Sequence, residues 1–224
     1  MIRRPPRSTL SSSSAASDVY KRQPSGALVN QEKIAQLAQD LDGLLLLDEA
    51  YVDFVDPGKN YDSVPLIKEN ESVVILRTLS KGYSLAGLRL GYGIGPQQLI
   101  QPMLSKTRDS YNLDGLSQFI GCRALGDSTH ALNNCELVRQ ERSKLRIEFK
   151  KLGFQVAPSE TNFILVTAPQ NHNAEELYLA LKQKNILIRF FNHDGLSNKL
   201  RVTVGTRREN KQLINALKKL IVVP

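Results

Sequence analysis

Apolar positions along the chain follow first a helical and then a strand-like period. Residues 31–41 carry apolar side chains at i, i+3, i+4 and i+7, which predicts a helix that ends at Gly43. Residues 43–47 and 72–76 are short apolar runs, typical of strands buried on both faces of a parallel sheet. Residues 88–95 alternate in a strand-like way, with glycines that allow close backbone approach. A helix beside buried strands predicts an α/β layer.

The pattern changes near residue 150, after a long helical segment. From there short strands alternate with helices, which predicts a smaller α+β domain. The sequence shows no internal repeat and no long linker between the two parts. The remaining expected helices are 96–104, 117–126, 131–152, 174–184 and 208–220, and the remaining expected strands are 154–156, 162–166, 186–189 and 200–204.

Residues 1–23 do not share this patterning. They hold six serines, paired prolines and no apolar periodicity, so they cannot bury enough surface to offset their ordering entropy, and we expect them to be disordered. No apolar stretch follows the arginines, which argues against a secretory signal, whereas the Arg- and Ser-rich composition leaves a transit peptide as an alternative. Because the segment is similar to translated vector sequence, we interpret it as a non-native leader and exclude it from fold reasoning.

The net charge suggests a nucleic-acid partner only until its distribution is considered. The 224 residues carry a formal charge of +8, and half of that excess lies in residues 1–23. From residue 24 onward charges of both signs are interspersed, which argues against a non-enzymatic basic module that binds nucleic acid. Two cysteines form no disulfide framework, and three histidines lack ligand spacing, so we expect a reducing compartment and no metal. The longest apolar run, 44–47, is too short to span a membrane.

Polar side chains suited to one cofactor follow the two buried strands. In open α/β sheets ligands bind at the carboxyl ends of strands, so these side chains would face a common site. Each could alone be a helix cap, a turn or a surface charge, but their order and spacing together favour a cofactor site. The residues are Asp48 and Tyr51 after the first strand, and Thr78, Ser80, Lys81 and Arg89 after the second.

These are the groups needed to hold pyridoxal phosphate. A lysine amine forms the Schiff base with this cofactor, and a carboxylate keeps its pyridine nitrogen protonated. A phenol can hydrogen-bond the ring oxygen. An arginine fork and two hydroxyls offer donors to the phosphate.

Four segments carry a resemblance to a known family. DEAYVDF, RTLSKGYSLAGLRLGY, PSETNFILV and LRVTVGT resemble the fold-type-I, class II pyridoxal-phosphate aminotransferases, most closely the histidinol-phosphate group. The resemblance runs from Pro24 to the C-terminus. It implies an α/β fold-type-I transferase with an incomplete large domain, built on a mostly parallel sheet, and a small C-terminal α+β domain. The implied divisions are a leader at 1–23, part of the cofactor-binding large domain at 24–110, connecting helices at 111–150 and the small domain at 151–224.

The resemblance also assigns roles by position. Lys81 is similar to the Schiff-base lysine that acts as general base and acid, and the other five cofactor residues match ligands of the ring or the phosphate. Asn162 lies where the family lines the substrate pocket. Arg201 matches the arginine that binds substrate carboxylates, or in the histidinol-phosphate group the substrate phosphate. Arg189 matches a second arginine on that phosphate, although a strand-end charge is an alternative.

The implied reaction is transfer of an amino group between L-histidinol phosphate and 2-oxoglutarate in histidine biosynthesis. The resemblance further implies a homodimer in the cytoplasm, or in a plastid if the source is a plant or alga. An aromatic-amino-acid aminotransferase and a threonine-phosphate decarboxylase remain alternatives with the same cofactor residues. A paired Arg189 and Arg201 would favour a phosphorylated substrate.

One family motif is incomplete in this chain. The family carries N-P-x-N-P-[ST]-G before the helix that precedes DEAY, whereas this sequence reads Gln23-Pro24-Ser25-Gly26. The match thus begins inside a motif, where the odd leader ends, and we expect an N-terminally truncated fragment joined to foreign sequence. Without the motif asparagine and the upstream phosphate-binding loop, we expect this chain alone to show no measurable transamination. We also expect unpaired strand edges and an uncovered apolar face.

Overall fold

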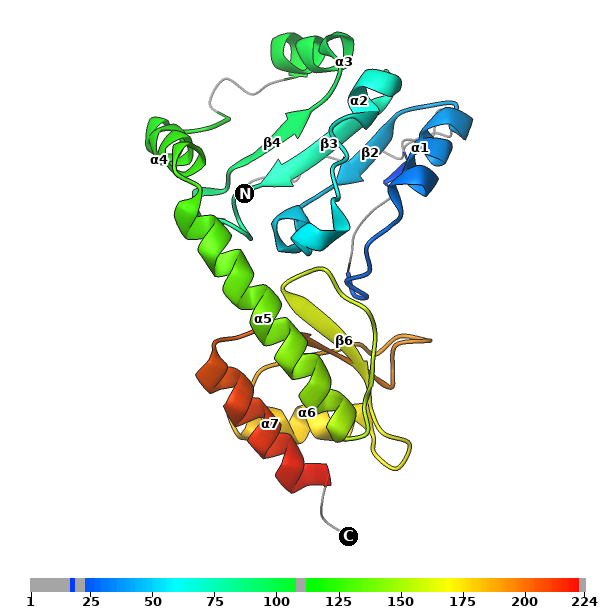
Figure 1. The fold of residues 1–224 in the computed structure, drawn as a ribbon, viewed down its shortest axis with the longest axis vertical. Coiled ribbons are helices and arrows are strands. Elements are labelled where there is room, and N and C mark those ends of the chain that lie inside the picture. The colour runs from blue at the N-terminus through cyan, green and yellow to red at the C-terminus, as the bar shows by residue number, and fades with distance from the viewer. Residues whose placement is uncertain (1–16, 19–22, 108–111, 222–224) are drawn as a thin grey trace, which may run out of the picture.

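The computed structural model describes residues 17–18, 23–107 and 112–221. It contains two sheets, in two parts of the chain that one long helix joins (Figure 1). Most of the expected leader lies outside the described residues, where its expected disorder stays a prediction. That expectation is wrong for Ser17–Asp18, which form a strand paired with the first sheet, and for Gln23, whose side chain makes two hydrogen bonds. The second sheet begins at Gln155, shortly after the change of period that the sequence shows near residue 150, and the division into domains at 110 and 150 stays a prediction.

The first sheet has the strand order β1-β2-β3-β4 and is mostly parallel, as predicted. The first three strands run parallel, and the fourth is antiparallel to its neighbour. The register pairs Leu47 with Ile75 and Asp48 with Leu76, so the last residue of β2 lies beside β3. The strands are β1 (Ser17–Asp18), β2 (Leu45–Asp48), β3 (Val73–Thr78) and β4 (Gly91–Ile94).

Helix α1 (Gln31–Asp40) covers one face of this sheet. Its N-terminus is capped by Asn30, whose side-chain oxygen accepts the Glu32 N–H at 2.7 Å. The buried Ile34 and Ala38 of this helix pack in one cluster with the alternate strand residues Leu45, Leu47, Val73 and Ile75.

The opposite face of the sheet is only partly covered. Leu44 and Leu76, on that face, are 39% and 37% exposed. The prediction of strands buried on both faces therefore holds for the face under α1 and only in part for the other face, where Val74 is buried. The short helical elements around the sheet are η1 (Val52–Phe54), η2 (Pro57–Lys59), α2 (Leu66–Glu69), η3 (Ala86–Leu88), α3 (Gln97–Pro102) and the π-helical η4 (Met103–Thr107).

Helix α5 (Thr129–Lys151) connects the two parts and follows α4 (Gly115–Gly126). Its first half lies against η1, and its second half packs on the second sheet and the C-terminal helix (Figure 1). Its buried stripe includes Cys135 and Leu145, but also the charged Arg142. This helix therefore brings residues from the first sheet and from the second sheet into one neighbourhood.

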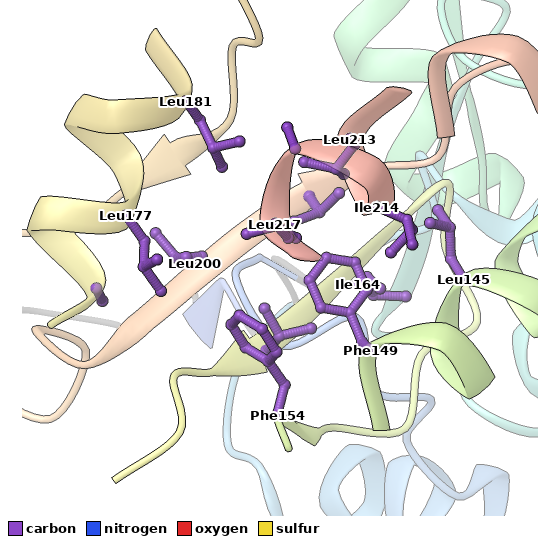
Figure 2. Packing of buried hydrophobic residues seen from close by; sticks show 14 of the residues in the cluster. Leu145, Phe149, Phe154, Ile164, Leu177, Leu181, Leu200, Leu213, Ile214 and Leu217 are labelled. Atoms are coloured by element: carbon purple, nitrogen blue, oxygen red, sulfur yellow. The ribbon is translucent and has the colours of Figure 1, made fainter. Parts of the chain in front are cut away.

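The second sheet is antiparallel, with the order β5-β6-β8-β7, which confirms the predicted α+β part. Its core is a single apolar cluster between the sheet and three helices, where Phe149 and Phe154 meet edge to face at 5.0 Å (Figure 2). Its elements are β5 (Gln155–Val156), β6 (Phe163–Thr167), α6 (Ala174–Gln183), β7 (Arg189–Phe190), β8 (Lys199–Thr203) and α7 (Arg207–Ile221).

Two of the predicted strands are wrong at their N-terminal ends. The strand expected at 88–95 begins only at Gly91, because 86–88 form a 3₁₀ turn and Arg89 adopts a left-handed backbone with φ of 53°. The strand expected at 186–189 is β7, which begins at Arg189. Among the described residues, no helix is long and apolar enough to cross a membrane.

Candidate active site

The carboxyl ends of β2 and β3 bring two of the predicted residues to the open face of the first sheet. Asp48 and Thr78 are the last residues of their strands, and alternation places both opposite the face that α1 covers. A cavity of about 440 Å³ opens here, within the range of small-molecule sites. Its lining residues are Asp48, Ala50, Leu76, Arg77, Thr78, Gly91, Tyr92 and Gly93.

The turn after β3 is held by hydroxyl contacts. Thr78 Oγ1 lies 2.9 Å from Ser80 Oγ and 3.1 Å from the Leu90 carbonyl oxygen, and it accepts the Ser80 N–H at 3.1 Å. The chain can return beside this turn because Gly91 has no side chain, since a Cβ there would lie 2.9 Å from the Arg77 carbonyl oxygen. The hydroxyls of Thr78 and Ser80 are thereby fixed at the start of the turn that carries Lys81.

Lys81 projects from this turn toward Tyr51. Its side chain is exposed, and its Nζ lies 5.8 Å from the centroid of the Tyr51 ring. The next residue, Gly82, packs against the Asp53 side chain, with which a Cβ at this position would overlap. A larger residue at position 82 would have to displace the Asp53 side chain, so glycine lets the chain after Lys81 pass closely over η1.

Tyr51 is the residue on which the site converges. Its ring meets Phe163 edge to face at 5.4 Å, and its Oη accepts a hydrogen bond from Gln23 Nε2 at 2.7 Å. Burial raises the pKa of the phenol, the Gln23 hydrogen bond and the Arg201 charge oppose that rise, and the Asp48 charge adds to it. The phenol is therefore neutral at pH 7 and can both donate and accept a hydrogen bond.

Two arginines lie opposite each other on the second sheet. The register of the antiparallel strands pairs Arg189 with Arg201, and each guanidinium lies within about 6 Å of the Phe191 ring. Like charges in directly opposed positions destabilise a sheet unless an anion lies near them. Arg201 Nη1 donates to Gln23 Oε1 at 2.7 Å, but the buried Nε has no hydrogen-bond partner among the described residues. The pair is chemically suited to a substrate anion.

The structure does not bring every predicted residue to the same place. Arg89 is exposed, its Nη1 donates to the Ala86 carbonyl oxygen of its own turn at 3.1 Å, and it does not line the cavity beside Thr78. Asn162 directly precedes Phe163 and is half-buried, and its carbonyl oxygen accepts the Val204 N–H at 2.8 Å. Their roles toward the phosphate and the substrate stay predictions.

Gln23 contributes a contact to the site, although the sequence analysis assigned this residue to the leader. Its amide joins the Tyr51 hydroxyl to the Arg201 guanidinium, two groups that come from the two different sheets. The only signal in the sequence is its position directly before Pro24-Ser25-Gly26, where the family pattern has an asparagine. Phe163 was also missed as a site residue, although it lies in the quoted segment PSETNFILV.

Cys135 lies beneath this site and gives a direct test of the packing. Its side chain is 1% exposed in a cluster with Tyr51, Phe54 and Phe163, and burial raises the pKa of its thiol to about 11. Because the thiolate is the reactive form, we expect iodoacetamide at pH 8 to modify the exposed Cys122 and to spare Cys135. Mass spectrometry should find one adduct in the native chain and two in urea. Equal rates at both cysteines in the native chain would contradict the packing.

Comparisons with known proteins identify what the chain is similar to. The family model described as "Aminotransferase class I and II" matches residues 22–217. Histidinol-phosphate aminotransferase 1 of Nostoc sp. is 43% identical over 198 residues, which is 88% of this chain and 54% of that relative. The solved histidinol-phosphate aminotransferase of Clostridium acetobutylicum has a TM-score of 0.79 at 27% identity, over 88% of this chain and 61% of that chain.

One solved structure of a different activity is similar in fold. The L-threonine-O-3-phosphate decarboxylase of Porphyromonas gingivalis has a TM-score of 0.74 at 24% identity, over 88% of this chain and 61% of that chain. At this identity the likeness concerns the fold alone. The chain spans about half the length of the curated relatives it matches.

Proposed function

The chain belongs to the class I and II aminotransferases, and from this premise we propose that its residues serve the transfer of an amino group from L-histidinol phosphate to 2-oxoglutarate. The aminotransferase fold is confirmed by the similarity to the Clostridium enzyme. In the proposed reaction the amine of L-histidinol phosphate becomes the ketone of imidazole acetol phosphate, and 2-oxoglutarate becomes glutamate. The observation that carries the proposal is the opposed pair Arg189 and Arg201, because two guanidinium groups fit a phosphorylated substrate.

The residues present fit pyridoxal phosphate as the cofactor. The fit rests on a cavity at the carboxyl ends of β2 and β3, with the Asp48 carboxylate and the Thr78 hydroxyl in its wall. When bound, this cofactor supplies an electron sink for the bonds of the substrate's amine-bearing carbon. Asp48 would hold the pyridine nitrogen in its protonated form, and Thr78 and Ser80 would donate to the phosphate, with Arg89 as a further donor.

Lys81 and Tyr51 provide the remaining chemistry. We assign Lys81 Nζ the covalent attachment of the cofactor and the movement of a proton to and from the amine-bearing carbon of the substrate. The exposed amine next to the phenol ring is accessible for both roles. It can form the covalent bond to the cofactor, and it can act as a base once that bond has been broken. The neutral Tyr51 hydroxyl would orient the cofactor ring through its oxygen.

The identity of the substrate rests on two independent supports. A paired arginine site accepts the phosphate of histidinol phosphate or of threonine phosphate, and it disfavours aromatic amino acids, which lack one. The 43% identity to the Nostoc enzyme favours histidinol phosphate between the first two. A homodimer, with glutamate and 2-oxoglutarate as the second substrate pair, completes the proposal.

A chimera tests the proposed function directly. The matched segment of the Nostoc enzyme is replaced by residues 24–224 of this chain, and turnover is measured with L-histidinol phosphate, phenylalanine and O-phosphothreonine. We expect transamination of L-histidinol phosphate to exceed that of phenylalanine, with no carbon dioxide released from O-phosphothreonine. Preferred turnover of phenylalanine, or decarboxylation of O-phosphothreonine, would contradict the proposal.

A further inference from the structure

One buried guanidinium lies between the two halves of the candidate site. Arg142 of α5 has a side chain that is only 6% exposed, although charged residues are rarely buried unless they are paired. Its Nη1 donates to the Phe54 carbonyl oxygen at 3.0 Å and to the Thr161 carbonyl oxygen at 2.9 Å. Phe54 ends the short helix that begins directly after Tyr51, and Thr161 directly precedes Asn162.

Glu160 adds to the link that Arg142 forms between the segments 51–56 and 159–163. Its Oε2 accepts Arg142 Nη2 at 2.9 Å and also the Asp56 N–H at 3.0 Å, so one carboxylate oxygen binds both the helix and the segment after η1. The backbone N–H of Glu160 donates to the Gly26 carbonyl oxygen at 2.8 Å. At the outer end of the same carboxylate, the half-exposed Lys59 forms a further ion pair at 3.1 Å.

We propose that Arg142, together with Glu160, is a positioning residue that fixes Tyr51 relative to Asn162 and Phe163. The segments 51–56 and 159–163 come from different parts of the fold, and the Arg142 guanidinium bonds both of them at once. A planar fork with several donors can do this, whereas a lysine ammonium on a flexible stem cannot satisfy the same acceptors in the same geometry. The proposal rests on the proposed function only for its statement that these two segments bind cofactor and substrate.

The link controls a contact that the site depends on. Tyr51 meets Phe163 edge to face, and the Arg201 guanidinium lies 5.2 Å from the centroid of that same Phe163 ring. If the segment 159–163 shifted away from 51–56, the Tyr51 ring would lose this neighbour. We therefore expect loss of the link to loosen the cofactor side and the substrate side together, while the apolar core of Figure 2 remains formed.

Hydrogen exchange on the full chain tests the link without any ligand. In Arg142→Lys we expect the Asp56 and Glu160 amides to exchange roughly tenfold faster, because the acceptors that hold both segments lose a buried partner. Amides of the pair β6 and β8 should keep their rates. In the control Lys59→Met, which removes only the exposed partner of the same carboxylate, all rates should stay within about twofold. A uniform acceleration over the whole chain in Arg142→Lys, or equal effects in both variants, would overturn the proposal.

A second arm measures the affinity of the same variants for pyridoxal 5′-phosphate by fluorescence titration. We expect Arg142→Lys to weaken binding roughly tenfold and Lys59→Met to leave it unchanged, since only the first releases the Tyr51 segment. Unchanged affinity in Arg142→Lys alongside local acceleration of exchange would overturn the assigned role at the site. If the unsubstituted chain itself fails to bind the cofactor, the titration is repeated with the same variants in the Nostoc chimera. Failure of the unsubstituted chimera to bind would count against the proposed function, and the exchange rates alone would then decide on the role of Arg142.

Discussion

Replacement of Lys81 by arginine in the Nostoc chimera should abolish transamination, with a loss of about 10³-fold or more in turnover of L-histidinol phosphate. The guanidinium keeps the positive charge but stays protonated at neutral pH, so it can neither attack the cofactor nor take a proton from the substrate. Because Lys81 is exposed, the substitution should leave the fold unchanged. Initial rates, together with circular dichroism as a check on folding, provide the measurement.

The matched control for this variant is Lys144→Arg on the outer face of α5. Lys144 is also an exposed lysine, and its ion pair with Glu141 is one that an arginine can replace. Turnover in this control should stay within about twofold of the parent chimera. If Lys81→Arg kept turnover within tenfold of the parent, Lys81 would not be the attachment and proton-transfer residue.

The elements that the sequence predicted well are those with a long or uniform pattern. The amphipathic period over 131–152 predicted α5 to within two residues at each end, because tertiary packing and helical spacing agree there. The apolar runs at 43–47 and 72–76 predicted β2 and β3, because consecutive apolar residues suit central strands. What the runs could not show was that only one face of the sheet is well covered, since that depends on which helices pack against it.

The predictions for short segments were wrong for a different physical reason. In 186–189, alternation is equally compatible with a strand and with an extended loop whose Ile186 and Ile188 pack on the core while Leu187 is 79% exposed. Of these four residues only Arg189 pairs with β8, because strand pairing depends on backbone register that side-chain alternation does not specify. Arg89 was expected in a strand, but its left-handed backbone ends a turn, and the next residue, Leu90, accepts a hydrogen bond from Thr78 Oγ1.

The residues of the candidate site also differ in how well the sequence could predict them. Lys81, Thr78 and Asp48 could be predicted because each follows a buried strand, and the carboxyl ends of such strands share one edge of the sheet. Gln23 could not, because its contact with Arg201 spans 178 positions of sequence and needs both parts of the fold in place. Arg142 was missed although it lies on the apolar stripe of its helix, seven residues after Cys135 and three before Leu145. Its position predicts burial, whereas its charge alone predicts a solvated side chain.

The second large effect is expected on the KM values when one of the paired arginines is replaced. The two arginines differ in their contacts, and we therefore expect them to differ in the substrates they bind. The Arg189 side chain is exposed and contacts only Phe191 among the side-chain interactions described, whereas the Arg201 side chain also reaches Gln23 beside the Tyr51 hydroxyl. Arg201 is therefore linked to Tyr51, on the side where we propose that the cofactor and the acidic group of either substrate bind. Arg189 has no such contact with Gln23 or Tyr51 among the interactions described, and we propose that it binds only the phosphorylated substrate.

In the chimera, Arg189→Gln should raise the KM for L-histidinol phosphate about 10- to 100-fold and leave the KM for 2-oxoglutarate within about twofold, because it removes a charged hydrogen bond to the phosphate alone. Arg201→Gln should raise both KM values, since the two acidic groups share this guanidinium. The control Arg208→Gln, an exposed arginine near the start of α7, should change neither. Steady-state kinetics with each substrate varied in turn decides the question. An equal rise of both KM values in Arg189→Gln would show that the pair does not distinguish a phosphate from a carboxylate.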